Sequence, residues 1–325
     1  MLKHNGKRCY LIAWLVINVT IILGITGCSS SSNEDNTSSY ISIENDVTTL
    51  ITGDETTSGS IYKDVTTSLE NDENTTSNIE DTTSDIGVSE DKYPSDISIR
   101  KLLNVAVQPL GSTMYIWGGG WNEEDTAAGP SATMIGVNPQ WKIYADVQDK
   151  NFDYKEHRYE INNGLDCSGY VGWVMYNVLQ EKDGQEGYVY KASTMSKIYS
   201  ELGLGEYIEK PTEFLAGDIV SMRKHVWICL GTCEDGSVLL IHSSPPGVTI
   251  SGTPLADGNK SQAQQLAEEY MKKYFSGWYE RYPDCSVSNS YISDVTVFRW
   301  SDKIMKDLKE YQGYSGEKIL QIIFQ

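Results

Sequence analysis

The chain has 325 residues, and its 45 acidic residues outnumber 26 basic residues to give a net charge of −19 at pH 7. This acidity argues against a nucleic-acid-binding protein, because phosphate groups are bound mainly by lysine and arginine. With 10% aromatic residues, the chain can still build a hydrophobic core of ordinary size.

The first 27 residues have the pattern of a signal peptide. Lys3, Lys7 and Arg8 form a basic start, and an apolar run follows from about residue 11 to residue 25. The run is short for a membrane-spanning helix and ends in small residues. We therefore expect export, with no membrane span in the mature chain.

The end of this segment, Ile25-Thr26-Gly27-Cys28, resembles a bacterial lipobox. The resemblance implies cleavage before Cys28 and diacylation of its side chain. Two acyl chains anchor a protein firmly, since each buried CH₂ contributes about 0.8 kcal/mol. An ordinary secreted signal peptide and an uncleaved anchor are the alternatives.

Residues 28–96 are predicted to be a disordered, lipid-anchored tether. From residue 29 onward, Ser, Thr, Asn, Asp and Glu dominate, and 16 acidic residues stand against two lysines. Such a segment buries too little apolar surface to offset the entropy lost on ordering. Its self-repulsion would extend it between membrane and domain.

Residues 97–325 are predicted to form one α+β domain. Helical patterns come first, at 97–107, after residue 167, and at 193–202. Strand patterns then dominate, at 216–222, 225–230, 238–242 and 247–251, with Glu234-Asp235-Gly236 as a hairpin turn. An amphipathic helix around 266–274, a strand at 295–300 and a helical end complete the chain. Helices followed by an antiparallel sheet favour α+β.

A long irregular segment, residues 121–163, interrupts the first half of this domain. Loops of this length inside a compact domain are usually functional or disordered. This one contains enough Trp, Tyr and Phe to be ordered.

Cys167 is the strongest candidate for a catalytic residue. It lies in Asp166-Cys167-Ser168-Gly169, directly before a helical apolar pattern. Asp166 is a good N-cap, so Cys167 falls in the first turn, where the helix dipole favours thiolate over thiol. A thiolate is the attacking form of cysteine. A buried core cysteine is the alternative.

His225 and His242 complete the candidate site. They lie at the start and the end of two predicted strands that a hairpin would pair antiparallel, so the side chains are expected to be neighbours. By the logic of catalytic triads, His225 takes the thiol proton and His242 orients the His225 ring. For a lone histidine, a structural role at a strand end would be the commoner explanation.

Several motifs together resemble the NlpC-type (NlpC/p-sixty) cell-wall cysteine peptidases. The matching stretches, spread over about residues 97–250, are Tyr115-Ile116-Trp117-Gly118-Gly119, Asp166–Val171, Gly217–Val220, His225–Ile228 and Ile241-His242-Ser243. The resemblance implies a papain-like fold, with N-terminal helices packed on an antiparallel sheet.

The same resemblance implies the activity and the remaining site residues. It implies hydrolysis of peptidoglycan stem peptides, commonly between D-γ-glutamate and the following diamino acid. Tyr115, Asp166 and Ser168 would bind substrate, and we add Trp117 from the same motif as Tyr115. The Cys167 amide would help to hold the oxyanion. The long segment 121–163 and the long segment after Ser243 depart from the family's pattern.

The resemblance therefore predicts a thiol peptidase without cofactor or metal. We expect a monomer, anchored through Cys28 to the cell membrane and facing the wall. The same residues would also serve a muramoyl-alanine amidase or an acyl transferase, and an inactive wall-binding protein is a further alternative. The sequence does not decide which wall bond is cut.

The other cysteines are less informative. Exported cysteines can oxidise, and Cys229, Cys233 and Cys285 allow one disulfide whose pairing the sequence does not choose. A zinc site on Cys229 and Cys233 with a histidine is the less favoured alternative.

Overall fold

The structure is a computed structural model that describes residues 93–180 and 187–325. The predicted signal peptide, the lipidation at Cys28 and nearly all of the predicted tether lie outside the described residues. Tyr93, which precedes the predicted domain boundary at residue 97, is buried in the core.

The described chain is a mixed α/β domain with one eight-stranded sheet and several helices, compatible with the predicted α+β class. The strands are β1 (Met114–Tyr115), β2 (Gly164–Leu165), β3 (Gly205–Ile208), β4 (Ile219–Met222), β5 (His225–Thr232), β6 (Val238–Ser244), β7 (Gly247–Gly252) and β8 (Thr296–Trp300). Their order across the sheet is β2-β1-β7-β6-β5-β4-β8-β3. All neighbours are antiparallel except β1 and β2.

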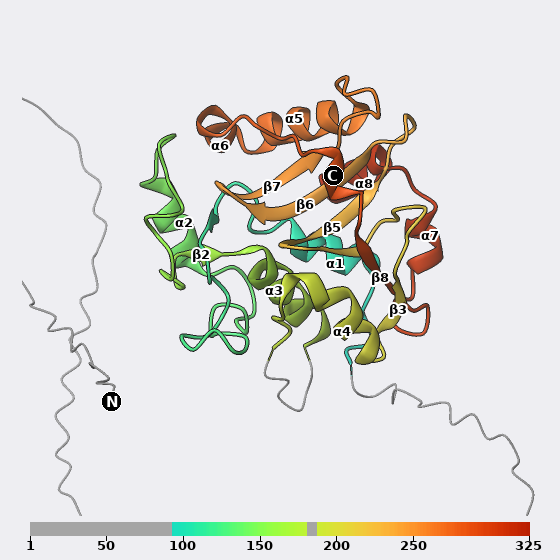
Figure 1. Ribbon diagram of the computed structural model, residues 1–325, viewed down its shortest axis with the longest axis horizontal. Helices are drawn as coiled ribbons and strands as arrows, with labels where there is room; N and C mark the ends of the chain where they lie inside the picture. The colour runs from blue at the N-terminus through green and yellow to red at the C-terminus, as the bar shows by residue number, and fades with distance from the viewer. Residues whose placement is uncertain (1–92, 181–186) are drawn as a thin grey trace, which may run out of the picture. The chain divides into compact units, whose positions relative to one another are not determined.

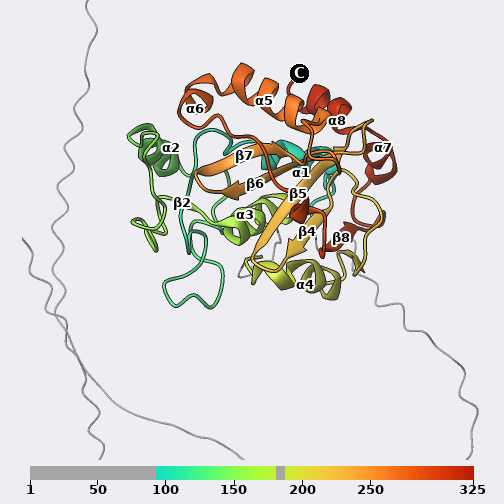
Figure 2. The ribbon, with the colours of Figure 1, turned by 45° about the horizontal axis from the view of Figure 1, so that its top comes forward.

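Helices lie on this sheet and at its ends (Figures 1 and 2). They are α1 (Ile99–Ala106), α2 (Pro139–Asp146), α3 (Cys167–Leu179), α4 (Met195–Glu201), α5 (Gln262–Tyr274), α6 (Ser276–Arg281), α7 (Leu308–Gln312) and α8 (Gly316–Ile323), with 3-10 turns η1 (Ala192–Thr194) and η2 (Asn289–Tyr291). Helix α3 packs on β5, β6 and α1, whereas α5 packs on β7. Among the described residues, no helix is long and apolar enough to cross a membrane.

Most predicted elements are confirmed within a few residues. The hairpin predicted at residues 234–236 joins β5 and β6, and the strand predicted at 247–251 is β7. The long segment 121–163 contains a helix, α2, that the sequence analysis missed. Its signals were present, since Asn138 caps the helix with a bond to Gln140 N of 3.0 Å and Pro139 occupies the first turn.

The sheet separates two apolar clusters. Alternate residues of β5 and β6, such as Val226, Ile228 and Ile241, join the main cluster with α1, α3, α5 and α8. The residues between them, such as Trp227 and Leu240, join a smaller cluster. The smaller cluster is covered in part by Tyr291 and Ile292, which come from the segment between α6 and β8.

Glycines allow the chain after β1 to pass directly over the start of α3. A Cβ on Gly169 would collide with the carbonyl oxygen of Gly119, and one on Gly120 with the Cα of Gly169. Gly120 also has a positive φ of 93°. The Asp166 amide completes the contact by donating to Gly119 O at 2.9 Å. The glycines therefore bring the Tyr115 motif and the cysteine motif together.

Candidate active site

Asp166 caps helix α3 as predicted, and Cys167 is the first helical residue. The Asp166 carboxylate accepts hydrogen bonds from the Gly169 amide at 2.7 Å and from the Ser168 hydroxyl at 2.8 Å. The Gly118 amide donates to the same carboxylate at 3.3 Å. Burial nevertheless raises the pKa of Asp166 to about 6, against the lowering effect of these bonds.

The sulfur of Cys167 lies between the start of α3 and the start of β5. Its residue is only 6% exposed. The Val226 amide, directly after His225, is directed at the sulfur, as are the amides of Ser168 and Cys167 itself. The contact with Val226 places the thiol alongside the first residues of β5, where His225 also lies.

Burial, rather than the helix dipole, dominates the protonation of Cys167. Loss of hydration raises the pKa of the thiol well above its ordinary value, and the Asp166 carboxylate raises it further. The three backbone amides lower the pKa but do not compensate. The amides of the helix start thus favour the thiolate, as expected, but the loss of hydration, which the sequence does not show, is the larger effect. Burial therefore favours the neutral thiol.

His225 and His242 are neighbours, as predicted from their strand positions. Nε2 of His225 lies 2.9 Å from Nδ1 of His242, and the ring centroids are 5.1 Å apart. Nε2 of His242 lies 3.2 Å from the hydroxyl of Ser251 on β7. The two rings and the hydroxyl thus form a linear chain of polar contacts across β5, β6 and β7.

Burial favours the neutral form of both imidazoles. Burial lowers the pKa of His225 to about 4, and burial together with the neighbouring His225 holds the pKa of His242 well below its usual range. A neutral ring has one N–H. If His225 donates from Nε2 to His242, then His242 donates from Nε2 to Ser251, and Nδ1 of His225 keeps a lone pair. This tautomer is the one that a general base requires.

The thiol and the imidazole are close but not bonded in this structure. Among the residues that the structure describes, no hydrogen bond joins Cys167 Sγ to either histidine. Catalytic hydrogen bonds are often long before substrate binds, so the lack of this bond does not argue against Cys167 and His225 acting as a catalytic pair.

Tyr291, in η2, covers the histidine pair and was missed by the sequence analysis. Its ring centroid lies 5.3 Å from that of His225 and 5.6 Å from that of His242, and both contacts are edge-to-face. Its hydroxyl is hydrogen-bonded with the Ser244 side chain. No sequence signal distinguishes this tyrosine from the 20 others in the chain.

The predicted substrate-binding residues have different surroundings. Tyr115 is buried beside Cys167 and packs edge-on against Tyr154 at 5.4 Å. The Ser168 hydroxyl donates to Asp166 and accepts from the indole N–H of Trp121 at 3.0 Å, so it is already engaged. Trp117 is 46% exposed, and the Arg158 guanidinium lies 5.6 Å from its ring centroid.

His157, the fourth histidine of the chain, lies away from this site. It stacks on Phe152 with a centroid distance of 5.0 Å and contacts the Glu160 carboxylate at 3.1 Å. These contacts hold it within the segment 121–163, consistent with its predicted place in the insertion.

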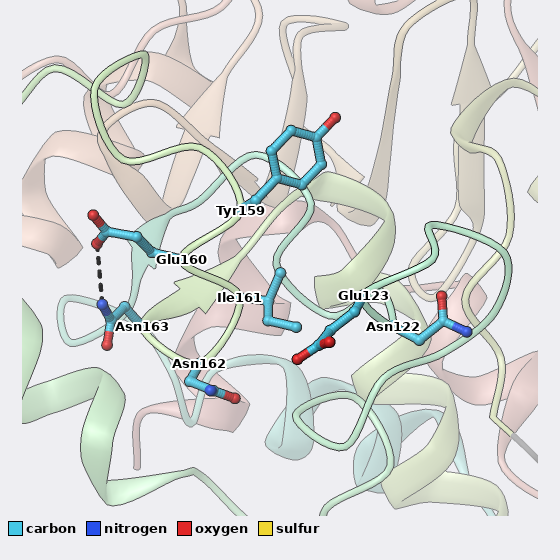
Figure 3. A pocket seen from close by; sticks show the side chains of 7 residues that line it. All are labelled: Asn122, Glu123, Tyr159, Glu160, Ile161, Asn162 and Asn163. Carbon is cyan, nitrogen blue, oxygen red and sulfur yellow. Dashed lines mark hydrogen bonds between the residues drawn. The ribbon is translucent and has the colours of Figure 1, made fainter. Parts of the chain in front are cut away.

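The segment 121–163 also contributes to a polar hollow of about 440 Å³ (Figure 3). Its lining residues are Asn122, Glu123, Tyr159, Glu160, Ile161, Asn162 and Asn163. Glu160 is bonded to Asn163 at 3.1 Å, as Figure 3 shows. The lining includes neither Cys167 nor either histidine of the pair, so this hollow is separate from the candidate active site.

The remaining described cysteines are free thiols. Cys229, Cys233 and Cys285 are buried and unpaired with one another, so none forms the disulfide that their export would allow. Among the described residues, no group of three or more His, Cys, Asp or Glu side chains is arranged to hold a metal ion.

Comparisons with family models, with curated proteins and with solved structures found no match to this chain.

Proposed function

We propose that the domain is a thiol hydrolase in which Cys167 is the nucleophile and His225 the base. One observation carries this proposal: the histidine pair, joined at 2.9 Å, lies at the start of β5, where the Val226 amide contacts the Cys167 sulfur. A capped helix start, a buried thiol and two linked imidazoles are the parts that nucleophilic catalysis by cysteine needs.

The chemistry begins with two neutral partners. Nδ1 of His225 takes the proton from Cys167 as the sulfur attacks the carbonyl carbon of a peptide bond. The oxyanion that forms would be held in part by the Cys167 amide. His225 then returns the proton to the leaving amine, and the C–N bond breaks. Water, deprotonated by His225, hydrolyses the thioester and restores the thiol.

His242 and Ser251 would orient the base. The contact to His242 would keep the proton on Nε2 of His225 and so leave the Nδ1 lone pair free to accept the thiol proton. When His225 becomes an imidazolium, the same contact spreads part of its charge. His242 is thus a positioning residue, and Ser251 fixes its ring in turn.

The motif resemblance extends this proposal to fold and substrate. We propose a papain-like arrangement of the NlpC type, supported by α3 packed on β5 and β6 with the cysteine at its first residue. On this basis the substrate is a stem peptide of peptidoglycan, and the scissile bond is the one that follows D-γ-glutamate. Of the predicted substrate-binding residues, Tyr115 comes from a distant part of the sequence and adjoins Cys167.

The location fits the same proposal. The lipobox-like Cys28 would anchor the chain to the outer face of the cell membrane, and the acidic tether would let the domain reach the wall. Fatty-acid labelling of wild type and Cys28→Ala tests the anchor. Label that persists after the substitution would contradict it.

Digestion of defined muropeptides by the purified full chain tests the function. Mass spectrometry of the products would show cleavage between D-γ-glutamate and the diamino acid. Cleavage between muramic acid and alanine would favour the amidase, and acyl transfer to an added amine would favour the transferase. Intact muropeptides after prolonged digestion would favour the inactive wall-binding protein and overturn the proposal.

A further inference from the structure

A cavity next to the histidine pair is not explained by the proposed catalytic residues. It has a volume of about 610 Å³ and is bounded by His242, Ser244, Ser251 and Tyr291 on one side. The other walls come from the turn after α2, the cis Pro245–Pro246 turn between β6 and β7, and the segment from Arg281 to Ser288. It therefore opens directly onto one side of His242.

Two cations, Arg281 and Lys150, line this cavity. The cations of the lining thus outnumber its acids, whereas residues 97–325 as a whole have 29 acidic and 21 basic residues. The lining contains one carboxylate, Asp284, which already accepts a hydrogen bond from the Ser286 amide at 3.0 Å. The charge available to a ligand in the cavity is thus positive.

Arg281 is held in place while one of its nitrogens remains open. Nη1 donates to the carbonyls of Ala145 and Gln148 at 2.8 and 2.6 Å, and Nε donates to Gly277 O at 3.2 Å. The guanidinium also lies 5.5 Å from the ring centroid of Tyr282. Among the described residues, Nη2 has no hydrogen-bond partner. A guanidinium oriented in advance binds an anion at little cost in side-chain entropy.

Lys150 is the second open donor. It is exposed, and within the described part of the chain its ammonium group makes neither an ion pair nor a hydrogen bond. An ammonium and a guanidinium that line one cavity are suited to an oxyanion such as a carboxylate. The hydroxyls of Ser286 and Ser288, which also line the cavity, can add neutral donors.

We propose that this cavity is a substrate subsite that binds a free carboxylate of the peptide through Lys150 and Arg281. The inference rests on the proposed function, since it assigns part of the same substrate. A γ-linked glutamyl residue keeps its α-carboxylate free near the scissile bond, and a stem peptide also ends in a carboxylate. Both sources offer the same group, and the experiment separates them.

The experiment compares three synthetic peptides with the full-length protein. One has both carboxylates, one has the glutamyl α-carboxylate as an amide, and one has the C-terminal carboxylate as an amide. The bound carboxylate is the one whose amidation lowers kcat/KM by about tenfold to a hundredfold, as expected for a charge-assisted hydrogen bond. The other amidation should leave kcat/KM unchanged.

The protein variants identify the cavity. Lys150→Gln should lower kcat/KM on the carboxylate peptide by about tenfold and leave kcat/KM on the matching amide peptide unchanged. Arg281→Gln should also lower kcat/KM on the carboxylate peptide. Arg281→Lys keeps the positive charge but loses the contacts to Ala145 and Gln148. A kcat/KM for Arg281→Lys that lies between those of Arg281→Gln and wild type would show that the charge of residue 281 contributes to binding. The control is Lys309→Gln, a lysine with an 87% exposed side chain on α7, which should change neither rate.

The outcomes of the test are distinct. Cleavage of all three peptides at equal rates by wild type and Lys150→Gln overturns the subsite and leaves the hydrolase intact. Failure of wild type to cleave any peptide overturns the proposed function and the subsite with it. Amidation that lowers kcat/KM equally in wild type and Lys150→Gln places the carboxylate elsewhere and also overturns the subsite.

Discussion

Nε2 of His225 and Nδ1 of His242 are 2.9 Å apart, across the open end of the β5–β6 hairpin. The contact joins the first residue of β5 to a residue near the end of β6, and a third strand continues it to Ser251. Strand pairing therefore places the proposed base beside the group proposed to orient it. The histidines can differ in role although they are the same residue type.

The nucleophile is tested first. Cys167→Ala should abolish wall-peptide hydrolysis, because it removes the thiol that contacts the Val226 amide next to His225. Cys167→Ser should lose nearly as much, since a hydroxyl is a poor nucleophile in this setting. Product formation on a defined muropeptide is the measurement, with urea unfolding to show that each variant stays folded. Full activity in folded Cys167→Ala would exclude the mechanism.

The two histidines should respond differently to substitution. His225→Ala should lower kcat/KM by about 10²- to 10⁴-fold, as loss of a general base does. His242→Asn and His242→Gln should lose less, because an amide oxygen can still accept the His225 N–H. The kcat/KM of His242→Ala should be lower than that of either amide variant but higher than that of His225→Ala. His157→Ala should have the kcat/KM of wild type. An active His225→Ala beside an inactive His157→Ala would place the base in the segment 121–163.

The protonation states predict how alkylation of Cys167 depends on pH. Burial raises the pKa of the thiol, so the thiolate fraction is small at neutral pH and grows only as pH rises. Burial also lowers the pKa of His225 to about 4, so there is no imidazolium to stabilise a thiolate above that pH. The alkylation rate at Cys167, followed by peptide mass mapping, should rise about tenfold per pH unit through neutral pH. A plateau from acid to neutral pH would instead indicate a thiolate–imidazolium pair.

The close approach of Gly169 to Gly119 predicts a loss of stability. Gly169→Ala places a methyl group against the Gly119 carbonyl, and the overlap should cost about 1–3 kcal/mol of unfolding free energy. Gly277→Ala is the matched control, because its helix α6 leaves open space around the added Cβ. It should be neutral or stabilising by up to about 1 kcal/mol. Equal effects of the two substitutions in urea unfolding would show that Gly169 tolerates a side chain.

Local signals predicted the parts of the site that depend on one helix start or on one hairpin. The Asp166 cap, the position of Cys167 and the approach of His225 to His242 follow from helix-start chemistry and hairpin geometry. The ring contacts of Tyr291 with His225 and His242 could not be predicted, because they depend on how the chain after α6 returns to cover β5 and β6.

The protonation of Cys167 could not be predicted for a related reason. A capping motif shows which amides face a thiol, but the hydration that the thiol loses depends on what packs above it from elsewhere in the chain. The same holds for Ser168, whose hydroxyl is engaged by Trp121 from a loop 47 residues away in sequence. Both the hydration of the Cys167 thiol and the hydrogen bonding of the Ser168 hydroxyl depend on the tertiary positions of residues from distant parts of the sequence.

The parallel pairing of β1 with β2 has a consequence for the length of the segment between them. Met114 and Tyr115 pair with Gly164 and Leu165, so the chain leaves the sheet at β1 and re-enters it on the adjacent strand. If the loop that joins the end of β1 to the start of β2 were four times longer, its closure would cost only about 1.2 kcal/mol more in entropy. Burial of Trp141 from α2 against Trp173 of α3, at a centroid distance of 5.8 Å, is enough to offset that entropy. The segment between β1 and β2 can therefore change in length at little cost in loop-closure entropy, whereas the paired strands beneath it keep their register.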